Sequence, residues 1–118
     1  IGADLCTPYE EDPKHPPLRI VQAQVDRLEN EIDDMNSKLE PLSSFILPGG
    51  TKLSALLHNA RTITRRAERE IVLLGSIENI NPLALKYINR LSDHLFVLSR
   101  HVNGNGELDV LWVPGNNR

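Results

Sequence analysis

The chain has 118 residues, and this length fits a single domain over residues 1–118. A net charge of −3 gives no general attraction to nucleic acid or to membrane surfaces, so we expect neither as a partner. One cysteine excludes an internal disulfide and fits a reducing compartment, and we expect a cytoplasmic location. No apolar run approaches the ~20 residues of a membrane-spanning helix.

The first residues form an N-terminal connector. Residues 1–5 read as the end of a helix with no start signal and no methionine, so we expect that an upstream segment has been removed. They also lack the basic-then-apolar layout of a signal peptide. Residues 7–17 hold four of the eight prolines, which excludes a regular helix or a central strand.

A first long helix is predicted from Leu18, with Pro16 and Pro17 at its start and Pro41 marking its end. Its apolar residues recur at steps of three and four, the period of one helix face. They are Leu18, Val21, Val25, Leu28, Ile32, Met35 and Leu39.

A second helix is predicted from about Lys52 to about Leu74. Pro48-Gly49-Gly50 forms a turn before it, and Thr51 is the candidate N-cap. The same alternating steps define its apolar face, which consists of Leu53, Leu57, Ala60, Thr64, Ala67, Ile71 and Leu74.

A third helix is predicted to begin at Asn81, as the cap, and Pro82, in the first helical position. The Asn-Gly-Asn-Gly run at 103–106 should end it, because both residue types tolerate positive φ. The β-prone tail at 108–115 has no evident partner strand and is expected to form an extended arm. The fold class is therefore all-α, an antiparallel helical bundle with a short extended C-terminal tail.

Residues 61–69 are the most informative segment, with four arginines and one glutamate. Arg61, Arg65, Glu68 and Val72 share one helix face beside the apolar face. Guanidinium groups suit phosphate or carboxylate, and Glu68 can orient one of them. The alternative is a solvated charged face stabilised only by pairs within the helix.

The third helix carries a polar set that includes Asn89 and Ser92. Such residues on an inner edge of a bundle usually form hydrogen bonds with each other or with a backbone group. A purely structural role for this polar set therefore remains an open alternative. No cysteine or histidine cluster has zinc-ligand spacing, and no P-loop occurs, so no metal site is expected. Phe45, just before the turn at 48–50, is either a packing residue or a functional one.

Three segments in this order resemble PduO-type ATP:cob(I)alamin adenosyltransferases. They are Ser-Phe-Ile-Leu-Pro-Gly-Gly at 44–50, Leu-His followed by Arg-Thr-x-x-Arg-Arg-Ala-Glu-Arg at 57–69, and Tyr-Ile-Asn-Arg-Leu-Ser-Asp at 87–93 with Leu-Phe at 95–96. Gly-Ala-Asp-Leu at 2–5 and the tail at 110–115 are also similar to this family, so the resemblance covers nearly the whole chain.

The resemblance implies a ferritin-like five-helix bundle and a homotrimer with active sites between subunits. It implies transfer of the 5′-deoxyadenosyl group of ATP to cob(I)alamin or another reduced corrinoid, with Mg²⁺ on the nucleotide and triphosphate as product. A corrinoid reductase and an adenosylcobalamin-dependent enzyme are the expected partners. The family's N-terminal Thr-Arg-x-Gly-Asp-x-Gly loop and first helix do not occur here. We therefore expect these residues to be the C-terminal part of such an enzyme.

The family's functional residues map onto named positions. The resemblance places ATP binding at Arg65, Arg66, Ala67, Glu68, Arg69 and Asn89. It places Arg61 at the subunit interface, paired with an aspartate of a neighbouring chain, and Phe45 at the corrinoid pocket. Arg65, Glu68 and Phe45 are the expected catalytic residues. The alternatives are a non-catalytic helical interaction module whose arginines bind an acidic helix, and a corrinoid carrier.

Overall fold

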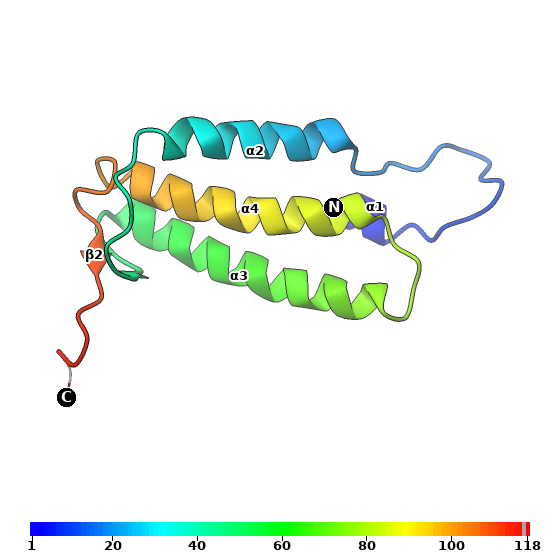
Figure 1. Ribbon diagram of the computed structural model, residues 1–118. Coiled ribbons are helices and arrows are strands. Elements are labelled where there is room, and N and C mark those ends of the chain that lie inside the picture. Colours follow the sequence, from blue (N-terminus) through cyan, green and yellow to red (C-terminus); the bar gives the residue numbers. More distant parts are fainter. Residues whose placement is uncertain (117) are drawn as a thin grey trace.

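The computed structural model describes residues 1–116 and residue 118. Its elements are α1 (Gly2–Leu5), α2 (Gln22–Asn36), β1 (Ile46–Leu47), α3 (Lys52–Gly75), α4 (Pro82–His101) and β2 (Val110–Leu111). The helix α4 lies between α2 and α3 and packs against both, and successive long helices run in opposite directions (Figure 1). The predicted all-α antiparallel bundle is confirmed.

The ends of α3 and α4 follow the capping signals in the sequence. The Thr51 hydroxyl accepts a hydrogen bond from the Ser54 amide at 3.1 Å, and the Asn81 side chain accepts one from the Leu83 amide at 3.1 Å. After α4, residues 104, 105 and 106 all have positive φ, so the Gly-Asn-Gly run ends the helix as predicted.

The start of α2 was predicted too early. The structure begins the helix at Gln22, not at Leu18, and residues 18–21 lie outside it. The Ile20 amide donates to the Asp4 carboxylate at 2.7 Å, and Arg19 donates to the same carboxylate at 2.9 Å. These contacts to a distant residue hold the segment out of the helix. The side chain of Gln24 then caps the Val21 amide at 3.0 Å.

The prediction that the tail is an unpaired extended arm was wrong. β2 pairs with β1 in an antiparallel ribbon, with Ile46 opposite Leu111 and Leu47 opposite Val110. Each strand has two residues, which is too short to show an alternating pattern in the sequence. The ribbon lies at the end of the bundle where α3 begins and α4 ends (Figure 1).

The predicted apolar face of α3 is buried or half-buried over most of its length, and only its first residue departs from the prediction. Leu53 is 54% exposed, whereas Thr64 and Ile71 of the predicted face are buried, as are the polar residues Ser54 and His58. The neighbouring helix α4 covers His58, because the Ser99 hydroxyl lies 3.2 Å from His58 Nε2.

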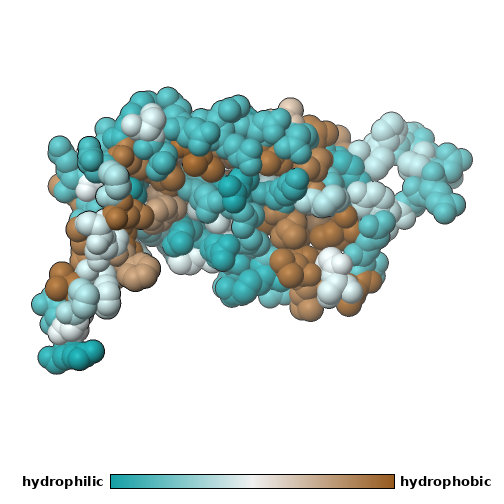
Figure 2. All heavy atoms as spheres, viewed as in Figure 1, coloured by the Kyte–Doolittle hydropathy of each residue, from teal (hydrophilic) through white to brown (hydrophobic). Residues whose placement is uncertain are grey.

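The core therefore mixes apolar and polar groups. Its buried apolar residues are Ile20, Val25, Leu28, Ile71, Ala84, Ile88 and Val97. Several large apolar side chains of α3 remain exposed, namely Leu53, Leu56, Ile63, Val72 and Leu73. On the face shown in Figure 2, apolar residues gather over the last turns of α3 and around the ribbon. Among the described helices, none is both long and apolar enough to cross a membrane.

Asp4 provides a test of how the N-terminal segment is held. Burial by itself raises the pKa of this carboxyl. The hydrogen bonds from the Ile20 amide, Arg19 and Asn81, with the charge of Arg19, outweigh burial and hold the pKa below 3.8. Ionised Asp4 thus stabilises the fold above its unfolded-state pKa, and this stabilisation is lost as the pH falls through the lower folded-state pKa.

We predict that Asp4→Asn lowers the free energy of unfolding at neutral pH by about 3 kcal/mol, because it leaves the partly buried Arg19 without its counter-charge. Urea titrations at several pH values would measure this. Between about pH 5 and pH 3, the stability of the variant should fall less than that of the parent protein. Equal losses in the two proteins would contradict the assignment.

Candidate functional site

A carboxylate at the contact between α3 and α4 organises the arginine-rich segment. One oxygen of Glu68 accepts a hydrogen bond from Arg65 at 2.5 Å, and the other accepts one from the Asn89 amide at 2.7 Å. The Glu68 side chain is 14% exposed, whereas that of Arg65 is 50% exposed. The predicted contact between Glu68 and an arginine is present, and Asn89 joins it from the other helix.

The polar chain continues along α4. The Asn89 side-chain oxygen accepts a hydrogen bond from Arg90 at 2.6 Å, and Arg90 also pairs with Asp93 at 3.0 Å. The Ser92 hydroxyl donates to the Asn89 backbone carbonyl at 2.9 Å, which confirms the local role expected for Ser92. The Asn89 side chain reaches across to α3. Its nitrogen donates to Glu68 and its oxygen accepts from Arg90, so Asn89 links these two side chains.

Two further arginines of the segment point outward. Arg66 and Arg69 are exposed, and within the described residues neither forms an ion pair. Ala67, between them, is half-buried. The segment thus presents one arginine fixed by Glu68 and two whose donors are free to meet an anion.

Arg61 lies one turn before this cluster in a different environment. Its guanidinium carbon sits 5.2 Å from the centre of the Phe96 ring, a cation–π distance. The ring of His58 packs edge-on against the same Phe96 at 6.2 Å. Burial and the nearby charge of Arg61 lower the pKa of His58, although Asp109 acts in the opposite direction. Across the described part of the chain, Arg61 has no acidic partner.

Phe45 lies apart from the Glu68 cluster. Its side chain is 77% exposed beside the ribbon, and its ring meets that of Trp112 at 5.9 Å in an edge-on arrangement. The ribbon adjoins the start of α3, and Arg65 lies 13 residues after Lys52. At 1.5 Å per residue, this separation is about 20 Å along the helix axis. The structure therefore does not bring Phe45 to Arg65 within one chain.

Two of the hollows beside α4 are lined by charged side chains, and sequence reasoning identified neither. A cavity of about 260 Å³ adjoins Asn89 and is lined by Lys86 and Arg90 together with residues of α2. Lys86 lies three residues before Asn89 on the same face of α4, and this spacing was the available signal.

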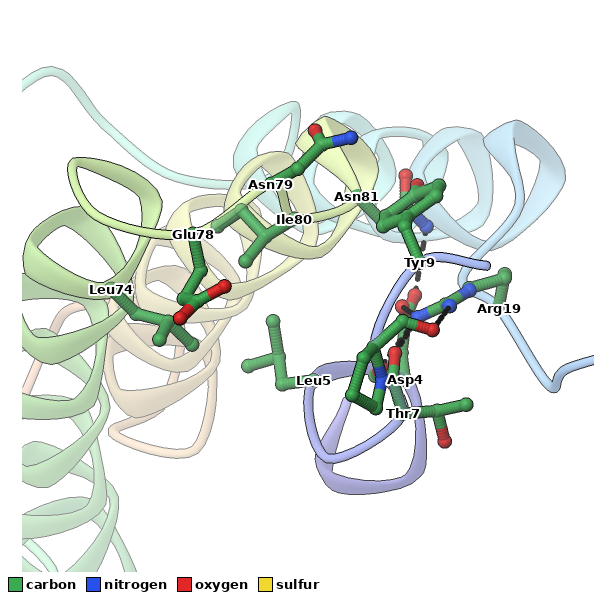
Figure 3. A pocket seen from close by; sticks show the side chains of 11 residues that line it. Asp4, Leu5, Thr7, Tyr9, Arg19, Leu74, Glu78, Asn79, Ile80 and Asn81 are labelled. Carbon is green, nitrogen blue, oxygen red and sulfur yellow. Dashed lines mark hydrogen bonds and ion pairs between the residues drawn. The ribbon is translucent and has the colours of Figure 1, made fainter. Parts of the chain in front are cut away.

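The second hollow, of about 240 Å³, lies at the opposite end of the bundle from the ribbon, between the N-terminal segment and the turn before α4 (Figure 3). Asp4 and Arg19 face each other there, and the Asn81 amide donates to Asp4 at 2.7 Å. These charged and amide groups satisfy one another. Among the residues that the structure describes, no three acidic, histidine or cysteine side chains gather into a metal site.

Comparison with known proteins identifies the family. The family model for cobalamin adenosyltransferase matches residues 1–102. The chain belongs to the cobalamin adenosyltransferase family. It is 56% identical over 119 residues to the corrinoid adenosyltransferase of Mycobacterium tuberculosis, covering 99% of this chain and 61% of that protein. The chain thus spans about three fifths of the length of this curated relative.

Solved structures agree with this family assignment. A variant PduO-type ATP:corrinoid adenosyltransferase from Lactobacillus reuteri, complexed with cobalamin and ATP, superposes with a TM-score of 0.85 at 42% identity, covering 96% of this chain and 61% of that one. An arginine-to-lysine variant of the L. reuteri enzyme, complexed with ATP, gives a TM-score of 0.84 at 42% identity over 95% of this chain and 62% of that one. The predicted family and fold class are confirmed.

Proposed function

We propose that this member of the cobalamin adenosyltransferase family acts in the transfer of the 5′-deoxyadenosyl group from ATP to a reduced corrinoid. The observation that carries the proposal is the cluster in which Glu68 holds both Arg65 and Asn89, with Arg66 and Arg69 exposed beside it. The L. reuteri enzymes of the same fold, complexed with ATP or with cobalamin and ATP, support it.

The reaction requires little covalent chemistry from side chains. Cobalt(I) of the corrinoid donates an electron pair to C5′ of ATP and forms a cobalt–carbon bond. The bond between C5′ and the triphosphate oxygen breaks, and its electron pair leaves with triphosphate. The protein has to stabilise this polyanion, place C5′ in line with cobalt and exclude water.

Each residue of the cluster has a distinct task in this step. Arg65, fixed by Glu68, donates to the triphosphate as negative charge develops on its oxygens. Arg66 and Arg69 add two further guanidinium groups, and Ala67 lies between them in the sequence as part of the proposed ATP-binding segment. Asn89 offers a donor and an acceptor to the ribose or base. The Mg²⁺ that accompanies ATP would be held by the phosphates.

Phe45 is the proposed corrinoid-binding residue. An exposed phenylalanine supported from one side by Trp112 can lie against the lower face of the ring and exclude an axial ligand from cobalt. One L. reuteri structure carries a phenylalanine-to-alanine change and another an arginine-to-lysine change. In that enzyme the two altered residues are separated by the same number of positions as Phe45 and Arg65, which supports both assignments.

We further propose a homotrimer in which active sites form between subunits. Phe45 and Arg65 lie far apart along one chain, and exposed apolar side chains line α3. Arg61 would pair with an aspartate of the neighbouring subunit. A corrinoid reductase would supply cobalt(I), and an adenosylcobalamin-dependent enzyme would receive the product.

The arginine assignment is tested by a double-mutant cycle in the full-length enzyme. Arg65→Ala should cost about 2–4 kcal/mol of transition-state stabilisation, because it removes a charge-assisted contact to triphosphate. Glu68→Gln should cost less, and the two effects should be non-additive because Glu68 acts through Arg65. Steady-state kinetics of adenosyl transfer would measure all three variants.

Arg27→Ala is the matched control, since Arg27 is an exposed arginine of α2 that pairs with Glu31 at 3.4 Å. It should leave turnover and ATP binding unchanged. Wild-type turnover in Arg65→Ala would overturn the assignment. A parent protein that does not bind ATP would favour the interaction module.

The role of Phe45 predicts a spectroscopic change. Phe45→Ala should leave ATP binding nearly intact but let water or the corrinoid's own base return to the lower face of cobalt. Cobalt(II) would then stay five-coordinate and hard to reduce. Electron-spin resonance of cob(II)alamin bound with ATP reports the coordination number. If the four-coordinate signal is as strong in the variant as in the parent, Phe45 is a packing residue.

The proposed assembly predicts a mass of three chains for the full-length protein in solution. Sedimentation equilibrium or light scattering over a dilution series would measure it, because an interface needed to complete the site should persist at micromolar concentration. A stable monomer at that concentration would rule out the trimer.

A further inference from the structure

One buried asparagine joins three separate segments beside the ribbon. The Asn103 side chain is fully buried and follows the last turn of α4. Its oxygen accepts hydrogen bonds from the Thr51 amide at 2.9 Å and from the Thr51 hydroxyl at 3.1 Å. Its nitrogen donates to the Gly49 carbonyl and to Asp109, each at 3.1 Å. Every hydrogen-bonding position of the amide is thus used.

The carboxylate of Asp109 has a second buried partner. Arg100 donates to its other oxygen at 2.9 Å, and the two side chains are 9% and 3% exposed. Arg100 also donates to the Glu40 carbonyl at 3.0 Å, in the loop after α2. The Asp109 carboxylate is therefore fixed from two sides by residues of α4 and its C-terminal turn.

The turn before α3 is shaped around the same amide. Gly50 has φ +87°, and a Cβ atom there would collide with the Asn103 amide group. A residue with a side chain is excluded at this position for both reasons. The turn and the asparagine therefore form one unit.

This unit holds both strands of the ribbon at the same end. Gly49 follows β1, and Asp109 precedes β2. Beyond the pairs of the two strands, the Trp112 amide donates to the Phe45 carbonyl at 2.8 Å, and the Ser44 hydroxyl donates to the Trp112 carbonyl at 2.7 Å. The placement of Phe45 against Trp112 therefore depends on the two ends that Asn103 fixes.

We infer that Asn103 is a positioning residue for the corrinoid half of the reaction. It acts through Gly49 and Asp109 to set where the ribbon presents Phe45. This inference rests on the proposed function. It concerns the placement of Phe45, the proposed corrinoid-binding residue, and not the proposed ATP-binding cluster around Glu68. The Glu68 cluster lies in the second half of α3 and shares no hydrogen bond with Asn103.

The other end of α4 provides a matched control. Asn81 is also buried, and its nitrogen donates to a carboxylate, Asp4, and to a carbonyl, that of Ile20. Asp4 is held by Arg19 as Asp109 is held by Arg100. Asn81→Ala therefore removes a similar set of hydrogen bonds about 30 Å from Asn103 along the 20-residue helix.

The experiment compares Asn103→Ala with Asn81→Ala in the full-length enzyme. We expect kcat for adenosyl transfer to fall about tenfold or more in Asn103→Ala while KM for ATP changes less than about twofold. The four-coordinate cob(II)alamin signal should weaken in parallel. Asn81→Ala should lower thermal stability to a similar extent and leave both readouts unchanged.

Hydrogen exchange supplies a readout that needs no activity. Peptides spanning 44–48 and 109–113 should exchange about tenfold faster in Asn103→Ala than in the parent, and at the parent rate in Asn81→Ala. Asn103→Asp should behave like the alanine variant, because a carboxylate cannot donate to Asp109 or to Gly49. Adding Asp109→Asn should restore part of the protection, since the new amide can donate to the new carboxylate.

The outcomes separate this inference from the proposed function. Parent-like exchange and cobalt signal in Asn103→Ala, or equal losses in Asn81→Ala, would overturn the positioning role. If the parent transfers no adenosyl group, the proposed function fails. Faster ribbon exchange in Asn103→Ala alone would then still establish that Asn103 holds the ribbon.

Discussion

The structure depends on two buried carboxylates, one at each end of α4, that are neutralised and hydrogen-bonded from several sides. A buried carboxylate is costly unless its oxygens and its charge are satisfied. At each end an arginine supplies the counter-charge and an asparagine supplies an amide donor. Because each set draws its members from distant segments, satisfying the carboxylate also fixes the path of the chain. The N-terminal segment and the ribbon are held to α4 in the same way.

A fixed α4 in turn determines the chemistry at the middle of the bundle. Asn89 projects from α4 and reaches Glu68 on α3, so the carboxylate is shared between an arginine of its own helix and an amide of the next. One oxygen of Glu68 accepts from Arg65 and the other from Asn89, so both are occupied. Arg66 and Arg69 are exposed and have no acidic partner among the described residues. The cluster thus combines one guanidinium fixed by an acidic partner with two that have none, an arrangement that suits the proposed contacts to triphosphate.

Local signals predicted much of this arrangement, and tertiary contacts account for what they missed. The ends of α3 and α4 could be predicted because Thr51, Asn81 and the Gly-Asn-Gly run act within a few residues of the helix ends. The contact between Arg65 and Glu68 follows from their spacing of three. By contrast, α2 starts late because Asp4 holds the Ile20 amide, and no local pattern reports a bond across 16 residues. The four-residue ribbon and the roles of Asn103 and Asp109 were missed for the same reason.

The face of α3 that carries the arginines changes its environment along its length, and this explains why polar residues are buried at the start of a helix whose apolar face was otherwise predicted. Ser54, His58, Arg61, Arg65 and Glu68 follow one another at steps of four and three. At the start of the helix, Ser99 and Phe96 of α4 cover this face, so Ser54 and His58 are buried. Further along the same face, the Arg61 guanidinium lies over the ring of Phe96. One turn later, the side chain of Arg65 is half exposed. The same polar face is thus covered by α4 at its start and half exposed at Arg65, and the change falls where α4 turns from Ser99 and Phe96 to Asn89.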